Sequence, residues 1–229
     1  MFGFRKGYVT CVMPTSVHTD LLFGAIDCFL SQTYGKKHLY IVEYGSLEHF
    51  KIVSEWIMRN VKDKSIVTLF KVGGMETKGQ AMNFAFAHCT DEYIALFEDN
   101  SYFGKERLER QVVALDGSGL SYSLLDKCLI KNNTDIDFDG GVNSSLLIQN
   151  HLLLGTEIKF GDDGSEFSKF YDDIRANYKR IVVPNNGIEY SIDLSGLTLR
   201  DEKAFFRSLL ECNEKKQMRE KIEKYLNNV

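Results

Sequence analysis

The chain has 229 residues, of which 44% are hydrophobic and 12% aromatic, so it can form a sizeable core. Its net charge of −4 argues against nucleic-acid binding as its main activity. The chain has only two prolines and no segment of biased composition, so we do not expect a long disordered region. No window approaches the ~20 apolar residues of a membrane-spanning helix. No long apolar run follows Met1, so we expect a soluble protein without a signal peptide.

The cysteines are scattered and form no CxxC pair, which argues against a structural zinc site. They are Cys11, Cys28, Cys89, Cys128 and Cys212. An odd, dispersed set is typical of reduced thiols in a cytosolic protein. We therefore expect a cytoplasmic location, and peripheral contact with a membrane stays open.

Strands and helices alternate through the first half of the chain. Tyr8 to Met13 is a mostly apolar run ended by Pro14, which predicts a strand buried on both faces. The expected elements are strand 8–13, helix 20–32, strand 38–42, helix 47–61, strand 65–72, helix 78–88, strand 93–97 and helix 105–116. This order predicts an α/β fold with a mostly parallel, Rossmann-like central sheet and helices on both faces.

The second half predicts a smaller, mixed region. Its expected elements are strand 120–131, a break at 140–141, a strand or strand–helix junction at 143–150, a polar loop at 160–165, helix 166–178, strand 180–183 and a short strand at 191–199. A charged helical segment follows at 201–227. We see no internal repeat and no clear linker, so we expect a single domain.

Glu98, Asp99 and Asn100 directly follow the expected strand 93–97. A buried strand that ends in carboxylates can place charge at a ligand crevice. Hard oxygen ligands suit Mg²⁺ or Mn²⁺, which can in turn hold a diphosphate. From this stretch alone, a polar turn in which Asp99 caps the next element is an equally good interpretation.

Other strand ends are polar as well. Thr15 and Ser16 follow the first strand, and Glu43 follows the second. Because ligands of open α/β sheets bind at the carboxyl ends of the strands, we expect these residues to lie near Asp99.

Several motifs, in order and at normal spacing, resemble those of the family 2 glycosyltransferases, which are inverting enzymes with the GT-A fold. The matching segments are Pro14-Thr15 ("P-T"), Phe29 to Tyr34 ("hxQTY"), Ile41 to Ser46 ("hVDDGS"), Ala81-Met82-Asn83 ("A-x-N"), Glu92 to Asn100 ("EYIxxLDDD") and Arg107-Leu108 with Gln111 ("RLxxQ"). The resemblance covers about the first half of the chain.

The resemblance implies transfer of a sugar from a nucleotide diphospho-sugar, with a UDP-sugar favoured, to an acceptor hydroxyl, assisted by Mn²⁺ or Mg²⁺. It places the nucleoside against Pro14, Thr15 and Ser16, and the base against Glu43, where the family usually has Asp. Lys78 would lie near the phosphates. Glu98 and Asp99 would hold the metal and the diphosphate, with Asp99 as the metal ligand.

Inversion also requires a general base, which in this family is often the Asp of an "ED" pair that opens a helix. Glu166 stands in that context, but Phe167 replaces the expected Asp. Tyr178 to Pro184, further on, resembles the family's "GYKIxxVP". Glu166 is one candidate for the base, and Asp163 or Asp162 in the preceding loop is the other. A missing base, and hence no turnover, is the third interpretation.

The resemblance divides the single domain into a nucleotide-sugar-binding half (1–117), an acceptor half (118–200) and a C-terminal helical segment (201–229). The acceptor is a glycan, a lipid-linked glycan or a protein, in surface polysaccharide or glycoconjugate synthesis. A homo-oligomer stays open. The alternative function is a catalytically silent GT-A-like binding or scaffold module. Nucleotide-sugar pyrophosphorylases share the sheet, but Pro14 to Val17 is not their Gly-rich, basic first loop.

Overall fold

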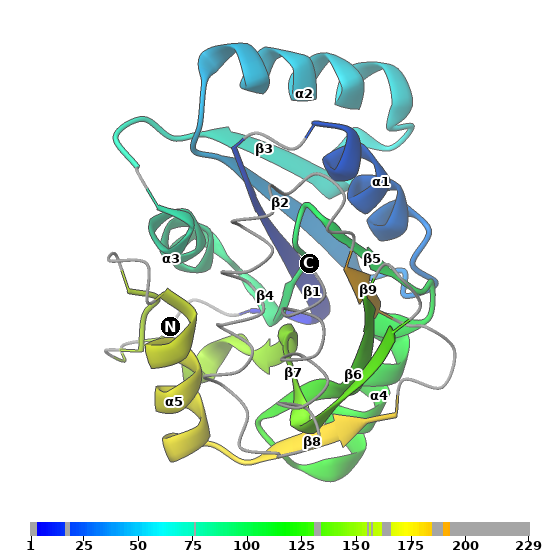
Figure 1. The fold of residues 1–229 in the computed structure, drawn as a ribbon, viewed down its shortest axis with the longest axis vertical. Coiled ribbons are helices and arrows are strands. Elements are labelled where there is room, and N and C mark those ends of the chain that lie inside the picture. Colours follow the sequence, from blue (N-terminus) through cyan, green and yellow to red (C-terminus); the bar gives the residue numbers. More distant parts are fainter. Residues whose placement is uncertain are drawn as a thin grey trace.

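A mixed β-sheet runs through the described part of the protein, which in this computed structural model comprises residues 4–16, 19–75, 77–130, 134–154, 156, 158–161, 166–184 and 190–192 (Figure 1). The first half of the chain supplies parallel strands in the order β3 (Val67–Lys71), β2 (Lys37–Glu43), β1 (Arg5–Thr15) and β4 (Asp91–Leu96). Helices between these strands make parallel pairing possible, because such pairs need long crossover connections.

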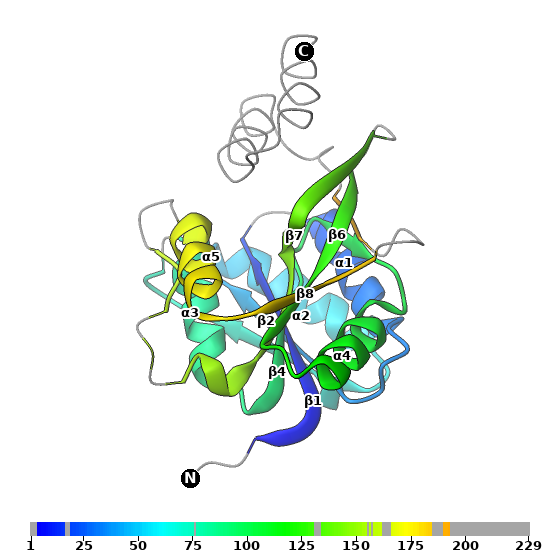
Figure 2. The ribbon, with the colours of Figure 1, turned by 90° about the horizontal axis from the view of Figure 1, so that it is seen from below.

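The second half extends the same sheet with both antiparallel and parallel pairs. β7 (Thr134–Gln149) is antiparallel to β4, and β6 (Tyr122–Ile130) is antiparallel to β7. β8 (Arg180–Val183) and β9 (Tyr190–Ile192) are parallel to β6, and β5 (Ser101–Phe103) pairs with β9. Figure 2 shows β6 and β7 side by side, projecting from the body of the molecule.

Helices cover both faces of the sheet because side chains alternate along each buried strand. Val9, Cys11 and Met13 of β1 face one cluster, which contains α1 (Thr19–Leu30), α2 (Leu47–Asn60) and α4 (Arg107–Ser118). Val12 faces the opposite cluster, which contains α3 (Lys78–His88) and α5 (Glu166–Asn177). Two short 3₁₀ helices, η1 (Lys64–Ile66) and η2 (Asn150–Leu152), complete the described elements.

The expected α/β fold and its mostly parallel first half are confirmed, with local differences. The expected strand 65–72 begins only at Val67, after the 3₁₀ helix η1. β1 continues through Pro14 to Thr15, since a proline can occupy a strand end where no N–H is required. β7 also runs through Gly140 and Gly141, where the sequence predicts a break, although the pairing register between β6 and β7 shifts there. The pair β5–β9 was not predicted from the short run 101–103.

The expected strand 191–199 is described only as far as Ile192, and the predicted helical segment 201–227 lies outside the described residues. Within the described residues, none of the helices is both long and apolar enough to cross a bilayer.

Candidate active site

The carboxyl ends of β1, β2 and β4 bring the polar residues predicted from the sequence to one edge of the sheet. Thr15 of β1 is aligned with Glu43 of β2, and the Tyr44 N–H donates to the Thr15 carbonyl oxygen at 3.1 Å. β4 lies on the other side of β1, and Glu98 and Asp99 follow its last residues. All four of these residues are buried.

Glu43 is fully buried and already has partners within the protein. One carboxylate oxygen accepts a hydrogen bond from the Gly45 N–H at 2.5 Å, and the other contacts Nδ1 of His49. His49 belongs to the first turn of α2, where the Ser46 side chain caps the helix by accepting from the His49 N–H at 3.0 Å. Glu43 therefore joins the end of β2 to the start of α2. Its predicted contact with a nucleobase stays a prediction, and would have to use the remaining acceptor capacity of the carboxylate.

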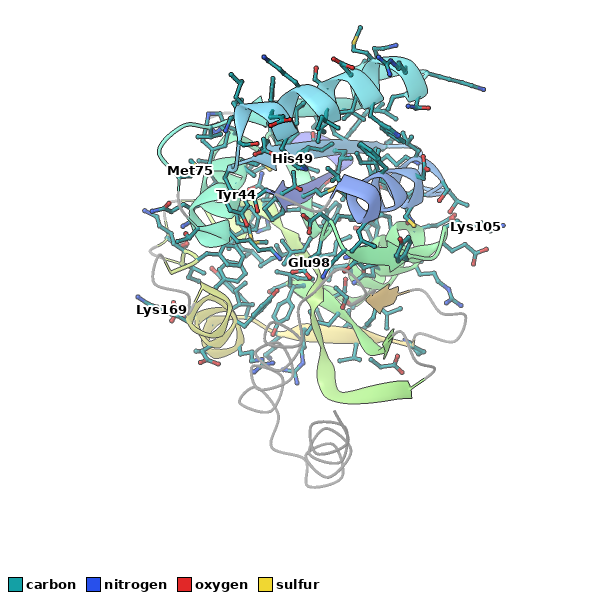
Figure 3. All side chains as sticks on the ribbon, turned by 45° about the horizontal axis from the view of Figure 1, so that its top comes forward. Tyr44, His49, Met75, Glu98, Lys105 and Lys169 are labelled. Carbon is teal, nitrogen blue, oxygen red and sulfur yellow. The ribbon has the colours of Figure 1, made fainter. Side chains whose placement is uncertain are left out.

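Gly45 is needed because two loops meet there. A Cβ at this position would lie 2.5 Å from the Ser16 carbonyl oxygen and 3.0 Å from a Glu43 carboxylate oxygen. The segment after β2 is thus packed directly on the segment after β1. Figure 3 shows Tyr44 and His49 beneath α2, with Glu98 nearer the middle of the molecule.

Two buried polar atoms beside this junction have no hydrogen-bond partner among the described residues: Thr15 Oγ1 and His49 Nε2. Buried polar atoms are usually paired with protein, water or ligand, so such atoms point to a missing partner. They lie at the end where the nucleoside is expected.

Lys78 opens α3 and pairs with Glu98 across 2.8 Å from Nζ to Oε1. The Lys78 side chain is 27% exposed and that of Glu98 is 11% exposed, so the pair lies at the border of the interior. Burial lowers the pKa of Lys78, but the carboxylates of Glu98 and Asp99 outweigh burial and hold the pKa above its usual value. Tyr44 also raises this pKa.

A divalent cation fits the residues that follow β4. Glu98 and Asp99 offer carboxylate oxygens, and the buried Oδ1 of Asn100 has no hydrogen-bond partner among the described residues. These are the hard oxygen donors that Mg²⁺ and Mn²⁺ prefer. Nowhere in the described ranges do three or more Asp, Glu, His or Cys side chains come together as a metal cluster.

Arg107 is fully buried and contacts residues on either side of the Glu98–Asn100 turn. Its Nη1 donates to the Leu96 carbonyl oxygen at 2.9 Å, and its Nε donates to Gln111 Oε1 at 2.9 Å. The guanidinium carbon lies 3.8 Å from the ring centre of Phe103 and 4.6 Å from that of Phe97. These contacts hold both sides of the Glu98–Asn100 turn in place.

Asn83 of α3 fixes the segment that leads to the candidate general bases. Its side-chain amide donates to the Phe160 carbonyl oxygen and accepts from the Phe160 N–H, both at 2.9 Å. The Phe160 ring in turn stacks on Phe170 of α5, with ring centres 3.9 Å apart. α5 lies beside α3 in Figure 1 and begins at Glu166.

The candidate bases themselves are only partly located. Glu166 is the first residue of α5, and the structure describes its backbone but not its side chain. Asp162 and Asp163 lie outside the described residues. The choice between Glu166 and these two residues stays a prediction.

Two functional features were missed from the sequence. His49 falls within an ordinary amphipathic helix pattern, and its position three residues after the Ser46 cap is the only local signal. Gln32 of the "QTY" match is a clamp between elements: its side chain donates to the Gly104 carbonyl oxygen at 2.8 Å and accepts from the Leu108 N–H at 3.1 Å. Gln32 therefore fixes the start of α4.

Several solved structures share the α/β fold of this chain. S. aureus TarS 1-349 in complex with UDP-GlcNAc matches with a TM-score of 0.69 and 14% identity, over 87% of this chain and 64% of that chain. The mannosyltransferase PcManGT from Pyrobaculum calidifontis, in complex with GDP-Man and Mn²⁺, matches with a TM-score of 0.63 and 17% identity, over 98% and 71%. The 4-diphosphocytidyl-2C-methyl-D-erythritol synthase of Anaerococcus prevotii matches with a TM-score of 0.54 and 12% identity, over 89% and 96%.

The mixed sheet, with its acidic segment at the carboxyl edge, is a GT-A glycosyltransferase fold. Residues 10–135, more than half of the chain, match the model "Glycosyl transferase family 2", and the chain belongs to that family. No curated protein matches the sequence. The chain spans less than two thirds of the TarS 1-349 structure.

Proposed function

We propose that the protein transfers a sugar from a nucleotide diphospho-sugar to an acceptor hydroxyl, with inversion and with the help of a divalent cation. The observation that carries this proposal is the junction of Lys78, Glu98 and Asp99 at the sheet edge that also holds Thr15 and Glu43. The spread of these residues suits an extended ligand, with a nucleoside at one end and a diphosphate at the other.

The nucleoside would lie against Pro14, Thr15, Ser16 and Glu43. The unpartnered Thr15 hydroxyl and His49 Nε2 are available for its polar edge or for a bridging water. Since a carboxylate only accepts hydrogen bonds, Nδ1 of His49 carries the proton that faces Glu43. A UDP-sugar is the favoured donor, and GDP-sugars are the first alternative to test.

The diphosphate would lie near Lys78 and the cation near Asp99, with Glu98 and the Asn100 amide oxygen in support. The leaving nucleoside diphosphate gains negative charge as the bond to the sugar breaks. A bound Mn²⁺ or Mg²⁺ would offset that charge without any proton transfer. The protein's own contribution is to fix these groups on rigid strand and helix ends, which Arg107 and Gln32 hold in place.

A carboxylate at the start of α5 would take the proton from the acceptor hydroxyl. Glu166 is the first candidate, and Asp163 and Asp162 are the second. The Asn83–Phe160 contact supports this placement, because it anchors the segment before these residues to α3, whose first residue is Lys78. The acceptor would be a glycan, a lipid-linked glycan or a protein, in polysaccharide or glycoconjugate synthesis.

The first test is binding of UDP and GDP, each with Mn²⁺ or Mg²⁺, by calorimetry. The wild type should bind one nucleotide in a metal-dependent manner, and Asp99→Asn should lose that dependence. Glu55→Gln is the matched control, because Glu55 is an exposed carboxylate on the outer side of α2. Absence of metal-dependent nucleotide binding by the wild type would contradict the proposal.

The second test compares transfer and donor hydrolysis for Glu166→Gln, Asp163→Asn and Asp162→Asn. The base variant should lose transfer while it still binds nucleotide. If none of the three loses transfer, the base lies elsewhere.

A silent nucleotide-binding module is the second candidate function. It is favoured by the departures from the family pattern at Glu43, Asn100 and Phe167, and by the engagement of Glu43 with Gly45 and His49. Nucleotide binding without hydrolysis or transfer across a panel of nucleotide sugars would select it.

A further inference from the structure

The ion pair between Lys78 and Glu98 occupies the place where the cation chemistry is expected. Lys78 Nζ lies 2.8 Å from Glu98 Oε1, and Asp99 is close enough to raise the pKa of the same ammonium. Both residues are buried. In the nucleotide-free protein, the Lys78 ammonium therefore neutralises part of the negative charge of Glu98 and Asp99.

Such an internal charge is needed because adjacent buried carboxylates repel each other and lose hydration. A lysine is a compact point charge on a flexible stem, so it can change partners by rotation about its side-chain bonds. The Lys78 side chain is 27% exposed, so it is not enclosed on all sides. An ammonium held in this way serves as a counter-ion that can be replaced.

A diphosphate changes the balance of these charges. Phosphate oxygens are strong acceptors for an ammonium and are also preferred ligands of Mg²⁺ and Mn²⁺. When the diphosphate arrives, Lys78 can transfer to its oxygens and release Glu98 for the cation. Without a diphosphate, Glu98 stays paired with Lys78, and a divalent cation has fewer oxygen ligands to bind.

We propose that Lys78 is the resident counter-ion of Glu98 and Asp99, and that it makes divalent cation binding depend on the diphosphate. The two ligands then bind with positive coupling, and the nucleotide-free enzyme leaves its carboxylates without metal. This inference rests on the proposed function for the identity of the diphosphate ligand. Its first test, however, needs no nucleotide.

The test is the binding of Mn²⁺ to the nucleotide-free protein, measured by the electron paramagnetic resonance signal of free Mn²⁺. Lys78→Met should bind Mn²⁺ at least about fivefold more tightly than the wild type, as a typical coupling between two sites would give. Lys78→Arg keeps the positive charge and should stay close to the wild type. Equal Mn²⁺ affinity for the wild type and a folded Lys78→Met would overturn the proposal.

Lys71→Met is the matched control for the change in net charge. Lys71 Nζ donates to the Gly45 carbonyl oxygen at 2.9 Å, so this lysine is bonded to the loop after β2. Its removal should change nucleotide-free Mn²⁺ affinity by less than about twofold, because such an exposed charge is screened by solvent. An equal gain in Lys71→Met and Lys78→Met would mean that only net charge matters, and would also overturn the proposal.

A second measurement uses the wild type alone, in case Lys78→Met does not fold. UDP or GDP, whichever binds, should raise the Mn²⁺ affinity of the wild type by at least about fivefold. If the nucleotide binds and leaves the Mn²⁺ affinity unchanged, the counter-ion proposal fails while the proposed function stands. If neither nucleotide binds, the proposed function fails, and the dependence of cation binding on the diphosphate fails with it.

Discussion

The carboxylate of Glu43 contacts the imidazole of His49, so the residue that ends β2 is bound to the first turn of α2 before any ligand arrives. Both side chains are buried, with 0% exposure for Glu43 and 7% for His49. The usual Asp of this family is one methylene shorter than Glu43. The longer side chain and the histidine are thus two parts of one local arrangement, which shapes the expected nucleoside end of the site.

Glu43→Ala should lower the free energy of unfolding, because it leaves the Gly45 N–H and the His49 ring buried without their acceptor. We expect a loss of about 1–3 kcal/mol for each unsatisfied group. Urea denaturation followed by circular dichroism measures the change. Glu55→Ala is the control, since the Glu55–Arg59 pair on the outer face of α2 is exposed and should cost only about 0.3–0.5 kcal/mol. Equal losses in the two variants would contradict the role given to Glu43.

Gly45→Ala should impair the site with little effect on distant structure. The new Cβ would lie 2.5 Å from the Ser16 carbonyl oxygen, and backbone atoms cannot move aside as a flexible side chain can. The loops after β1 and β2 would separate, and a misplacement of about 1 Å can reduce turnover on the order of 10²-fold. Nucleotide affinity and transfer rate are the measurements. Gly73→Ala is the matched control, because no atom lies within 4 Å of its added Cβ.

Arg107→Met should destabilise the protein and disorder the Glu98–Asn100 turn. It removes the donor to the Leu96 carbonyl oxygen and leaves Gln111 Oε1 without its partner. Hydrogen bonds to charged groups contribute about 1.5–3 kcal/mol each, so the loss in unfolding free energy should exceed about 2 kcal/mol. Lys105→Met, at an exposed position just before α4, should change stability by less than about 0.5 kcal/mol. A similarly small effect for Arg107→Met would show that the buried guanidinium is dispensable.

Two of the cysteines should resist alkylation in the native protein. Burial raises the pKa of Cys11 and of Cys89 to about 12, so little thiolate forms near pH 8. Iodoacetamide followed by mass spectrometry should leave both unmodified in native buffer and modify both in urea. Labelling of either residue under native conditions would contradict their place in the core.

The sequence predicted the first half of the fold well because its strands are short apolar runs between amphipathic helices, a pattern that few other folds produce. The residues after β4 were also predictable, since Glu98 and Asp99 follow a buried strand directly. The pairing of His49 with Glu43 was not, because it depends on how α2 packs on the sheet. Nor was the role of Gln32 and Gln111, whose long-range bonds to Gly104 and Ser145 join segments far apart in the chain. Several residues of the motifs that resemble the family thus hold distant segments of the chain together.

The pH dependence of stability should contain a contribution from His38, at the opposite end of β2 from the site. Burial, followed by the nearby Arg5 guanidinium, lowers the pKa of His38 below its usual 6.5. Arg5 can only donate, so Nδ1 of His38 accepts its hydrogen bond at 3.2 Å, and Nε2 carries the proton that faces Thr68 Oγ1 at 3.1 Å. Protonation of Nδ1 would replace this acceptor with an N–H directed at a cation.

The unfolded chain therefore binds a proton at His38 more readily than the folded chain does. The His38 contribution to stability is complete above pH 6.5, and it is lost as the pH falls from 6.5 towards the lower pKa of the folded state. The midpoint of thermal unfolding, measured between pH 5 and 8, should fall less steeply towards acid in His38→Gln than in the wild type. Glutamine can still accept from Arg5, so the substitution removes the titration while it keeps the contact. Identical slopes for the two proteins would mean that His38 titrates alike in the folded and unfolded chains.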